Sequence, residues 1–154
     1  MTSFNTVPNR YSAITPYLNV EDAGVAIEYY EKVFGAIVEE KLESNKGIVH
    51  AEIRIGDSVV MLGCEFPELG FHSPKKYGGS PVTICLYIDD VDSVIAEAIE
   101  NGATEYSPIV DKFYGDRVGS ITDPFGHVWT VLTHVEDVSP EEMQRRVEKL
   151  GDNV

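Results

Sequence analysis

The sequence predicts an α+β protein made of two tandem βαβββ modules followed by one further helix. The first observation is an internal repeat, because residues 18–35 are echoed by residues 86–102. The second is that residues 56–62 are echoed by residues 126–132. Strand, acidic helix cap, helix and later strands thus recur in the same order, as in a duplicated module. Two copies matter because paired sheets can close around a single cleft.

Length and composition place the chain among single-domain globular proteins. It has 154 residues, of which 43% are hydrophobic and 25% charged, so it can bury a proper core. We expect one domain over residues 1–154, divided into a first module at about 11–64, a linker at 65–80, a second module at about 81–135 and a C-terminal helix at about 139–150.

The strong negative charge limits the classes of partner. A formal net charge of −14 and an isoelectric point near 4.5 disfavour nucleic acid and anionic membranes, since both are bound mainly through Lys and Arg. A cationic or neutral small molecule fits better. The alternative is that the acidic surface serves solubility alone.

Targeting signals and cysteine spacing point to a cytoplasmic protein. No stretch approaches the roughly 18 consecutive apolar residues of a membrane helix, and residues 1–10 lack the hydrophobic core of a signal peptide. Cys64 and Cys85 form neither metal-type nor redox-type spacing, so we expect buried free thiols.

The elements of the first module follow from local patterns. Residues 13–20 alternate as a strand does, and Asp22 then caps a helix that ends at Gly35. Residues 48–55 alternate apolar with polar side chains and lead into a strand over residues 59–64.

The linker and the second module show the same kinds of pattern. Residues 65–80 are rich in Gly, Pro and Lys and predict a loop that covers the cleft. The remaining predicted elements are a strand over residues 82–89, a helix that begins near Val91 and ends at Asn101-Gly102, strands around residues 105–110, 117–122 and 127–134, and a C-terminal helix that starts at the capping box Ser139-Pro-Glu-Glu142 and runs towards Gly151.

Several motifs resemble the vicinal oxygen chelate superfamily. They are Ile14-Thr-Pro-Tyr-Leu-Asn-Val20, His50-Ala-Glu-Ile-Arg-Ile-Gly-Asp57, Tyr114-Gly-Asp-Arg117 and Asp123-Pro-Phe-Gly-His-Val-Trp129. Within it, the sequence looks most like the glyoxalase/bleomycin-resistance and PhnB-like branch over residues 11–135. The resemblance implies two βαβββ units whose sheets form a cup, in a homodimer whose cup or interface holds the ligand.

The usual metal-ligand positions of that superfamily carry other residues here. Its metal enzymes present four side chains on the cup face, drawn from His, Gln, Glu and Tyr. The matching positions in this chain are Thr15, Thr83, Thr130 and either Val60 or Met61. Neutral hydroxyls and an apolar side chain cannot replace imidazole and carboxylate donors, so we expect no metal and no cofactor.

Histidines and a carboxylate are the candidates for catalysis. His50 and Glu52 lie two apart on a strand and share a face, so they could act as an acid/base pair or as displaced metal ligands. The alternative is that they are polar side chains facing solvent. His127 and His134 flank the last strand, where a histidine more often bonds to the backbone.

Hydroxyl and aromatic side chains are the candidates for ligand binding. The opening strands present Thr15, Tyr17 and Asn19, and Thr83, Cys85 and Tyr87, opposite their apolar sides. Such a wall can stack against planar groups and donate hydrogen bonds, unless it fills a collapsed interior. Aromatic residues near the last strands, Phe113, Tyr114, Phe125 and Trp129, form either core or ligand platform. Arg117 is either an anion-binding contact or a rim salt bridge.

Together these features predict a function. The expected ligand-binding residues are Thr15, Tyr17, Thr83, Cys85, Tyr87, Tyr114, Arg117, Trp129 and Thr130. We expect a homodimeric, metal-independent protein that sequesters or carries an organic small molecule, and its negative charge favours cationic ligands. The alternative is a lyase or isomerase of the vicinal oxygen chelate type that uses His50 and Glu52, and a purely structural domain is a third possibility.

Overall fold

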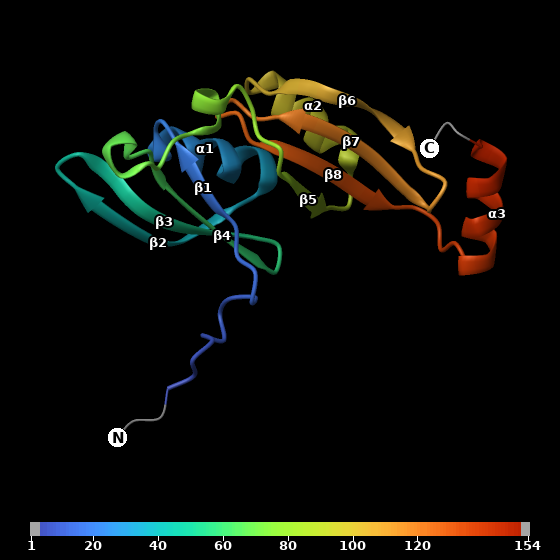
Figure 1. Ribbon diagram of the computed structural model, residues 1–154, viewed down its shortest axis with the longest axis horizontal. Coiled ribbons are helices and arrows are strands. Elements are labelled where there is room, and N and C mark those ends of the chain that lie inside the picture. The colour runs from blue at the N-terminus through green and yellow to red at the C-terminus, as the bar shows by residue number, and fades with distance from the viewer. Residues whose placement is uncertain (1–3, 152–154) are drawn as a thin grey trace. The chain divides into compact units, whose positions relative to one another are not determined.

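A computed structural model describes residues 4–151, which form two compact units. The first unit comprises the chain up to Ser80 together with Phe125–His127, and the second comprises Pro81–Pro124 and the chain from Val128 onward. In each unit one helix lies against one face of a four-stranded sheet (Figure 1). No helix within residues 4–151 is both long and apolar enough to cross a membrane.

The first unit is a βαβββ module. Its elements are β1 (Tyr17–Val20), α1 (Ala23–Phe34), β2 (Ile37–Ser44), β3 (Gly47–Ile55) and β4 (Ser58–Cys64). The strand order is β1-β4-β3-β2, in which β1 runs parallel to β4 and the other neighbours are antiparallel. The carboxylate of Asp22 accepts hydrogen bonds from the backbone N–H groups of Gly24 and Val25, and Gly35 ends α1 at a φ of 64°.

The second unit repeats this module and adds a helix. Its elements are β5 (Thr83–Tyr87), α2 (Val91–Glu100), β6 (Thr104–Asp111), β7 (Asp116–Thr122), β8 (Val128–His134) and α3 (Pro140–Leu150). The strand order is β5-β8-β7-β6, and Asp90 caps α2 through the N–H of Ser93. The α+β class, the two βαβββ modules and the C-terminal helix predicted from the sequence are confirmed.

Strand alternation separates an apolar face from a polar face in each sheet. On β3, the side chains of Ala51, Ile53 and Ile55 are buried and face α1. On β7 and β8, Ile121 and Val131 are buried on the side of α2. Since successive side chains of a strand point to opposite faces, the polar partners of these residues lie on the other side of each sheet.

Two predicted segments differ in detail from the structure. The first strand begins at Tyr17 and not at residue 13. The hydroxyl of Thr15 donates a hydrogen bond to the carbonyl of Ser12 in a turn, and Pro16 has no N–H group that could join a sheet. The linker contains two short 3-10 helices, Pro67–Leu69 and Pro74–Tyr77.

The C-terminal helix α3 begins where its capping box predicts. The hydroxyl of Ser139 accepts a hydrogen bond from the N–H of Glu142. No residue of α3 is buried, and the helix is held by Arg146, whose guanidinium donates to Glu136 and to the backbone carbonyl of Phe113. Polar contacts therefore attach this helix.

Candidate functional site

The polar face of the first sheet brings together Tyr17 of β1 with His50 and Glu52 of β3. The strand register places Tyr17 beside Met61 of β4, Met61 beside Glu52, and Glu52 beside Glu40 of β2. Glu52 is only 3% exposed, although it lies on the polar face. A buried carboxylate requires donors, because an unpaired buried charge is costly.

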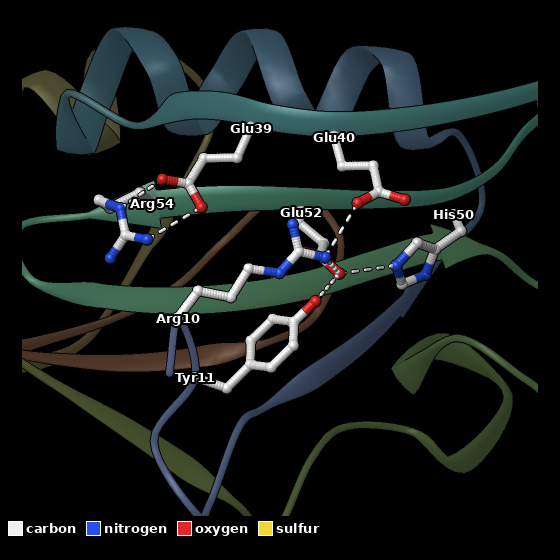
Figure 2. A network of polar contacts seen from close by, with 7 residues as sticks. All are labelled: Arg10, Tyr11, Glu39, Glu40, His50, Glu52 and Arg54. Atoms are coloured by element: carbon white, nitrogen blue, oxygen red, sulfur yellow. Dashed lines mark hydrogen bonds and ion pairs between the residues drawn. The ribbon is translucent and has the colours of Figure 1, made fainter. Parts of the chain in front are cut away.

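The donors to Glu52 come largely from the segment that precedes β1 (Figure 2). The hydroxyl of Tyr11 donates to Oε1 of Glu52 at 2.6 Å, and Nη2 of Arg10 lies 3.3 Å from the same oxygen. Nη2 also lies 3.1 Å from Oε2 of Glu52 and 3.0 Å from Oε2 of Glu40. The contact with Oε2 of Glu52 is an ion pair without hydrogen-bond geometry, so this buried oxygen has no hydrogen-bond donor among the described residues.

The balance of these contacts keeps Glu52 ionised. Burial acts to raise the pKa of Glu52, but the hydrogen bonds from Tyr11 and His50 and the charge of Arg10 together lower it below its usual value. The site therefore offers a carboxylate, not a carboxylic acid, at neutral pH.

His50 links Glu52 to Tyr17. Its Nε2 lies 3.4 Å from Oε1 of Glu52, and its Nδ1 lies 3.3 Å from the hydroxyl of Tyr17. The two rings are 5.6 Å apart at their centres. Burial, and then the nearby Cys64 thiol, raises the pKa of Tyr17. The predicted pair is thus brought together, and hydroxyl, imidazole and carboxylate form a chain along which a proton could move.

A glycine in β4 makes room for this chain. A Cβ atom on Gly63 would lie 2.8 Å from the hydroxyl of Tyr17 and 2.7 Å from the carbonyl oxygen of Val49. Because real contacts of a Cβ atom are longer, only glycine at this position lets Tyr17 lean across β4 towards His50.

The second sheet carries a separate polar cluster on the face of β5. Tyr87 donates its hydroxyl hydrogen to Oδ2 of Asp116 at 2.8 Å, and Nδ1 of His134 lies 2.8 Å from Oδ1 of the same carboxylate. Nε2 of His134 lies 2.9 Å from Asp137. Asp116 is 4% exposed. The sequence predicted a ligand-binding role for Tyr87 but gave no site role to Asp116, although its position next to Arg117 on a strand was the available signal.

These contacts perturb the side chains around Asp116. The Asp116 carboxylate, and then Asp137, raises the pKa of His134. The hydrogen bond to Asp116 raises the pKa of Tyr87. Burial, followed by the charges of Asp116 and Cys85, raises the pKa of Tyr114.

The hydroxyl and thiol candidates of the second sheet share one face. Thr83, Cys85 and Tyr87 are exposed on β5, and Thr130 lies beside Cys85 on β8 with its Oγ1 2.9 Å from the hydroxyl of Ser120. Cys85 is exposed and Cys64 is partly exposed, so the expectation of buried thiols is wrong. Thr15 lies outside β1, in the turn that precedes it.

Arg117 and Trp129 lie on the helix-facing side of the second sheet. Arg117 donates two hydrogen bonds to Asp92 of α2, at 2.7 and 2.8 Å, and one to Asp111 at 3.0 Å. Trp129 is 1% exposed and its indole N–H donates to Asp123 at 2.8 Å. Of the alternatives left open by the sequence, the structure shows a salt bridge for Arg117, on the helix side of the sheet and not at the rim of a cup, and a core position for Trp129. Neighbouring positions of a strand face opposite sides, so Asp116 and Thr130 occupy the polar face instead.

The remaining candidates behave as structural residues. Nε2 of His127 lies 3.0 Å from the backbone carbonyl oxygen of Asn19. Phe125 is buried, with its ring 5.7 Å from that of Tyr29 and 5.8 Å from that of Tyr30. The ring of Phe113 packs edge-on against that of Tyr114.

The side chains at the superfamily's metal positions do not fit a divalent ion. Thr15, Thr83 and Thr130 offer neutral hydroxyls, and Met61 offers a thioether between Tyr17 and Glu52. Across residues 4–151, no three or more His, Cys, Asp or Glu side chains are grouped to hold a metal. Zinc and similar ions need several imidazole, thiolate or carboxylate donors, which these four positions do not supply.

Curated relatives share most of the length of this chain. An uncharacterized protein of Mycobacterium bovis is 38% identical over 144 residues, which cover 91% of this chain and 95% of that protein. An uncharacterized protein of Mycobacterium tuberculosis H37Rv is also 38% identical over 144 residues, with 85% of its length covered.

Solved structures show the same fold. The product of an Arabidopsis thaliana gene is 27% identical with a TM-score of 0.63, covering 82% of this chain and 99% of its own. TioX from Micromonospora sp. ML1 is 22% identical with a TM-score of 0.62, covering 83% and 100%. A PhnB protein from Bacillus cereus is 15% identical with a TM-score of 0.62, covering 79% and 99%. The sequence pattern of one family matches residues 10–131, and the chain therefore belongs to the Glyoxalase/Bleomycin resistance protein/Dioxygenase superfamily.

Proposed function

We propose that the protein binds an organic, cationic small molecule without a metal, and sequesters or carries it as a cytoplasmic homodimer. The observation that carries this proposal is Glu52, a buried and ionised carboxylate with one oxygen that lacks a hydrogen-bond donor among the described residues. An incoming N–H donor with a positive charge would satisfy that oxygen, and charge-assisted hydrogen bonds are among the stronger ones.

Aromatic and hydroxyl side chains support the same proposal. The ring of Tyr17, which is half exposed, and that of Tyr11 lie near Glu52 and can stack against a planar or cationic group. The net charge of −14 favours the approach of cations over anions. On the second sheet, taken by itself, Thr83, Cys85, Tyr87, Tyr114 and Thr130 remain candidate ligand contacts.

Native mass spectrometry of the freshly purified protein, combined with elemental analysis, tests this proposal. We expect the mass of a dimer, a retained organic molecule, no stoichiometric metal and an unchanged fold in chelator. Stoichiometric zinc, nickel, manganese or iron that survives dialysis would overturn the metal-independent function.

A second candidate function is catalysis by His50. The observation that favours it is the position of His50 between the hydroxyl of Tyr17 and the carboxylate of Glu52. Because the pKa of Glu52 is lowered, Glu52 would orient the imidazole, and His50 would carry the proton in a lyase or isomerase reaction. If turnover of a substrate survives replacement of both His50 and Glu52 with Ala, this mechanism fails. Loss of turnover with retained binding of a non-reacting ligand supports it.

A further inference from the structure

We propose that the segment containing Arg10 and Tyr11 is a built-in competitor for the Glu52 site. It places a guanidinium where the ligand binds, and the ligand that displaces it carries a planar, delocalised cation such as a guanidinium or an amidinium. This inference rests on the proposed binding of a cation at Glu52. It adds the chemical class of the cation and the way in which access is regulated.

Arg10 already makes the contacts expected of such a ligand (Figure 2). Its Nη2 lies 3.0 Å from Glu40 and 3.1 Å from Glu52, and so bridges two carboxylates. Its Cζ lies 4.7 Å from the centre of the Tyr11 ring, a cation–π distance. A flat guanidinium is suited to stacking and bridging at once, whereas an ammonium is a compact and strongly hydrated charge.

Arg10 fits the Glu52 site imperfectly. The N–H groups of Arg10 are not directed at Oε2 of Glu52, which stays buried without a donor among the described residues. An unsatisfied buried acceptor carries a desolvation cost. A free ligand can orient its N–H groups without a covalent tether, and so gains a hydrogen bond that Arg10 does not make.

The segment that carries Arg10 and Tyr11 is held by few contacts. It precedes β1, belongs to no strand or helix, and is exposed at every described residue up to Arg10. Among residues 4–11, the other hydrogen bonds are local, from the Tyr11 N–H to the Pro8 carbonyl and between the side chains of Asn5 and Asn9, and the chain is next tied to the sheet at Pro16, whose carbonyl accepts from the Met61 N–H. The side chain of Arg10 is itself 46% exposed. Segments with exposed backbone and few buried contacts open at low free-energy cost, so displacement is feasible.

A neighbouring arginine on the same face does not play this role. Arg54 of β3 is held by Glu39 of β2 through two nitrogens, Nε and Nη2, and by the backbone carbonyl of Asp57 (Figure 2). It is fixed by its strand and contacts neither carboxylate oxygen of Glu52 in the described structure. Arg10, in contrast, lies outside the sheet and can withdraw from Glu52 without breaking a strand.

Competition makes a quantitative prediction. When Arg10 leaves the site free in only about 1–10% of molecules, the apparent association constant of the ligand is the intrinsic constant multiplied by that fraction. Removing the competitor restores the intrinsic affinity. Replacing Arg10 with Ala is therefore expected to tighten binding of a planar cation by about tenfold or more. The same variant makes the chain more acidic by one charge, so Arg145→Ala, which removes an exposed guanidinium paired with Glu142, is the matched control.

The experiment measures the binding of benzamidine to the full chain by titration calorimetry. Benzamidine carries a planar amidinium, benzylamine a primary ammonium and benzamide no charge. We expect Arg10→Ala to bind benzamidine about tenfold more tightly than wild type, Arg145→Ala to resemble wild type, and Glu52→Gln to weaken binding in both the wild-type and the Arg10→Ala background. Benzylamine should gain less from Arg10→Ala, and benzamide nothing.

A measurement on the wild-type protein does not depend on how any variant folds. In a two-dimensional NMR titration, benzamidine should shift the Nε–H signal of Arg10 and the backbone amide of Tyr11 towards their values in an unstructured peptide. Unmoved signals at saturating benzamidine would overturn the competitor.

The outcomes separate this inference from the proposed function. If Arg10→Ala binds benzamidine through Glu52 but no more tightly than wild type, competition is wrong while cation binding at Glu52 stands. If Arg10→Ala tightens the binding of benzylamine as much as that of benzamidine, the assignment of the ligand to planar, delocalised cations is wrong. If neither wild type nor Arg10→Ala binds any cation, both the inference and the proposed site at Glu52 fail.

Discussion

At the scale of single residues, burial and the hydrogen-bond donors of Glu52 have opposite effects on its pKa. Burial acts to raise its pKa, and Tyr11, His50 and Arg10 reverse that effect. A group whose pKa is lowered by folding stabilises the folded state at any pH above the pKa that the group has in the unfolded chain, which is 4.5 for Glu52. That contribution is lost as the pH falls through the lower pKa of the folded state.

We therefore predict that Glu52→Gln destabilises the protein at pH 7 by about 1–3 kcal/mol, the usual range for hydrogen bonds to charged groups. The amide can still accept from Tyr11 but brings no negative charge to Arg10. The difference from wild type should shrink as the pH falls below 4.5, because the unfolded chain takes up a proton there before folded Glu52 does, and it is lost once the pH passes the lower folded pKa. Urea unfolding across pH 3–7 measures this. Glu40→Gln, at an exposed carboxylate on the same guanidinium, should cost less, and a difference for Glu52→Gln that is constant with pH would contradict the prediction.

The contribution of His134 to the stability of the fold changes with pH in the opposite direction to that of Glu52. Asp116, and secondarily Asp137, raises its pKa above the usual 6.5, so protonated His134 stabilises the fold below pH 6.5 and this contribution is lost as the pH rises through the folded value. We predict that, as the pH rises above 6.5, wild type loses stability relative to His134→Gln. NMR titration of the imidazole should show that Asp116→Asn lowers the pKa of His134 more than Asp137→Asn does, and equal effects would show that Asp116 is not the main partner.

The sequence predicted the shared face of His50 and Glu52 because strand alternation is a local property. It did not predict Arg10 and Tyr11 as their partners, since the segment before β1 has no periodicity from which its fold can be inferred. Trp129 was assigned to a ligand site because aromatic residues cluster near the last strands, and Arg117 because a basic side chain facing an apolar cup would need an anionic partner. Their faces depend on the register of those strands, in which a shift of one position exchanges the two sides.

At the scale of elements, helix boundaries were predicted better than strand boundaries. The caps of α1 and α3 lie at Asp22 and Ser139, as their side-chain chemistry predicts. The start of β1 was placed too early, because Thr15 and Pro16 form a turn that residue alternation does not reveal.

Gly63 of β4 provides a test of how one element shapes the site. Glycine weakens a strand relative to alanine, so propensity alone predicts that Gly63→Ala stabilises the protein by about 0.5–1 kcal/mol. The contacts predict the reverse, since the added Cβ would meet the Val49 carbonyl at 2.7 Å and the Tyr17 hydroxyl at 2.8 Å. We expect a loss of about 1–3 kcal/mol in the free energy of unfolding, as for overpacked cores.

The double variant Gly63→Ala with Tyr17→Phe separates the two contacts. Removing the phenol hydroxyl relieves one contact and leaves that with the Val49 carbonyl, so part of the lost stability should return. Equal stability of Gly63→Ala and wild type would mean that the crowding is relieved by backbone movement.

At the scale of the whole molecule, duplication did not produce two copies of one site. Each polar face joins a tyrosine, a histidine and a buried carboxylate. In the first unit the carboxylate is in the middle of β3, at Glu52, whereas in the second it is at the start of β7, at Asp116. The repeat predicts the fold of both modules because the apolar positions recur. It cannot predict the two clusters, since their residues occupy positions that do not correspond.

The net charge of −14 acts on the whole molecule and gives the last prediction. A long-range field attracts a cationic ligand from solution, and this steering is screened as the Debye length falls from about 10 Å at 0.1 M salt to about 3 Å at 1 M. Contacts inside a buried site are screened much less. Raising the salt concentration over this range should therefore slow the association of benzamidine with Arg10→Ala more than it speeds dissociation. Stopped-flow kinetics measures both rates, with benzamide as the neutral control. An association rate independent of salt would mean that the acidic surface serves solubility alone, and that selection for a cation is confined to Glu52 and its immediate neighbours.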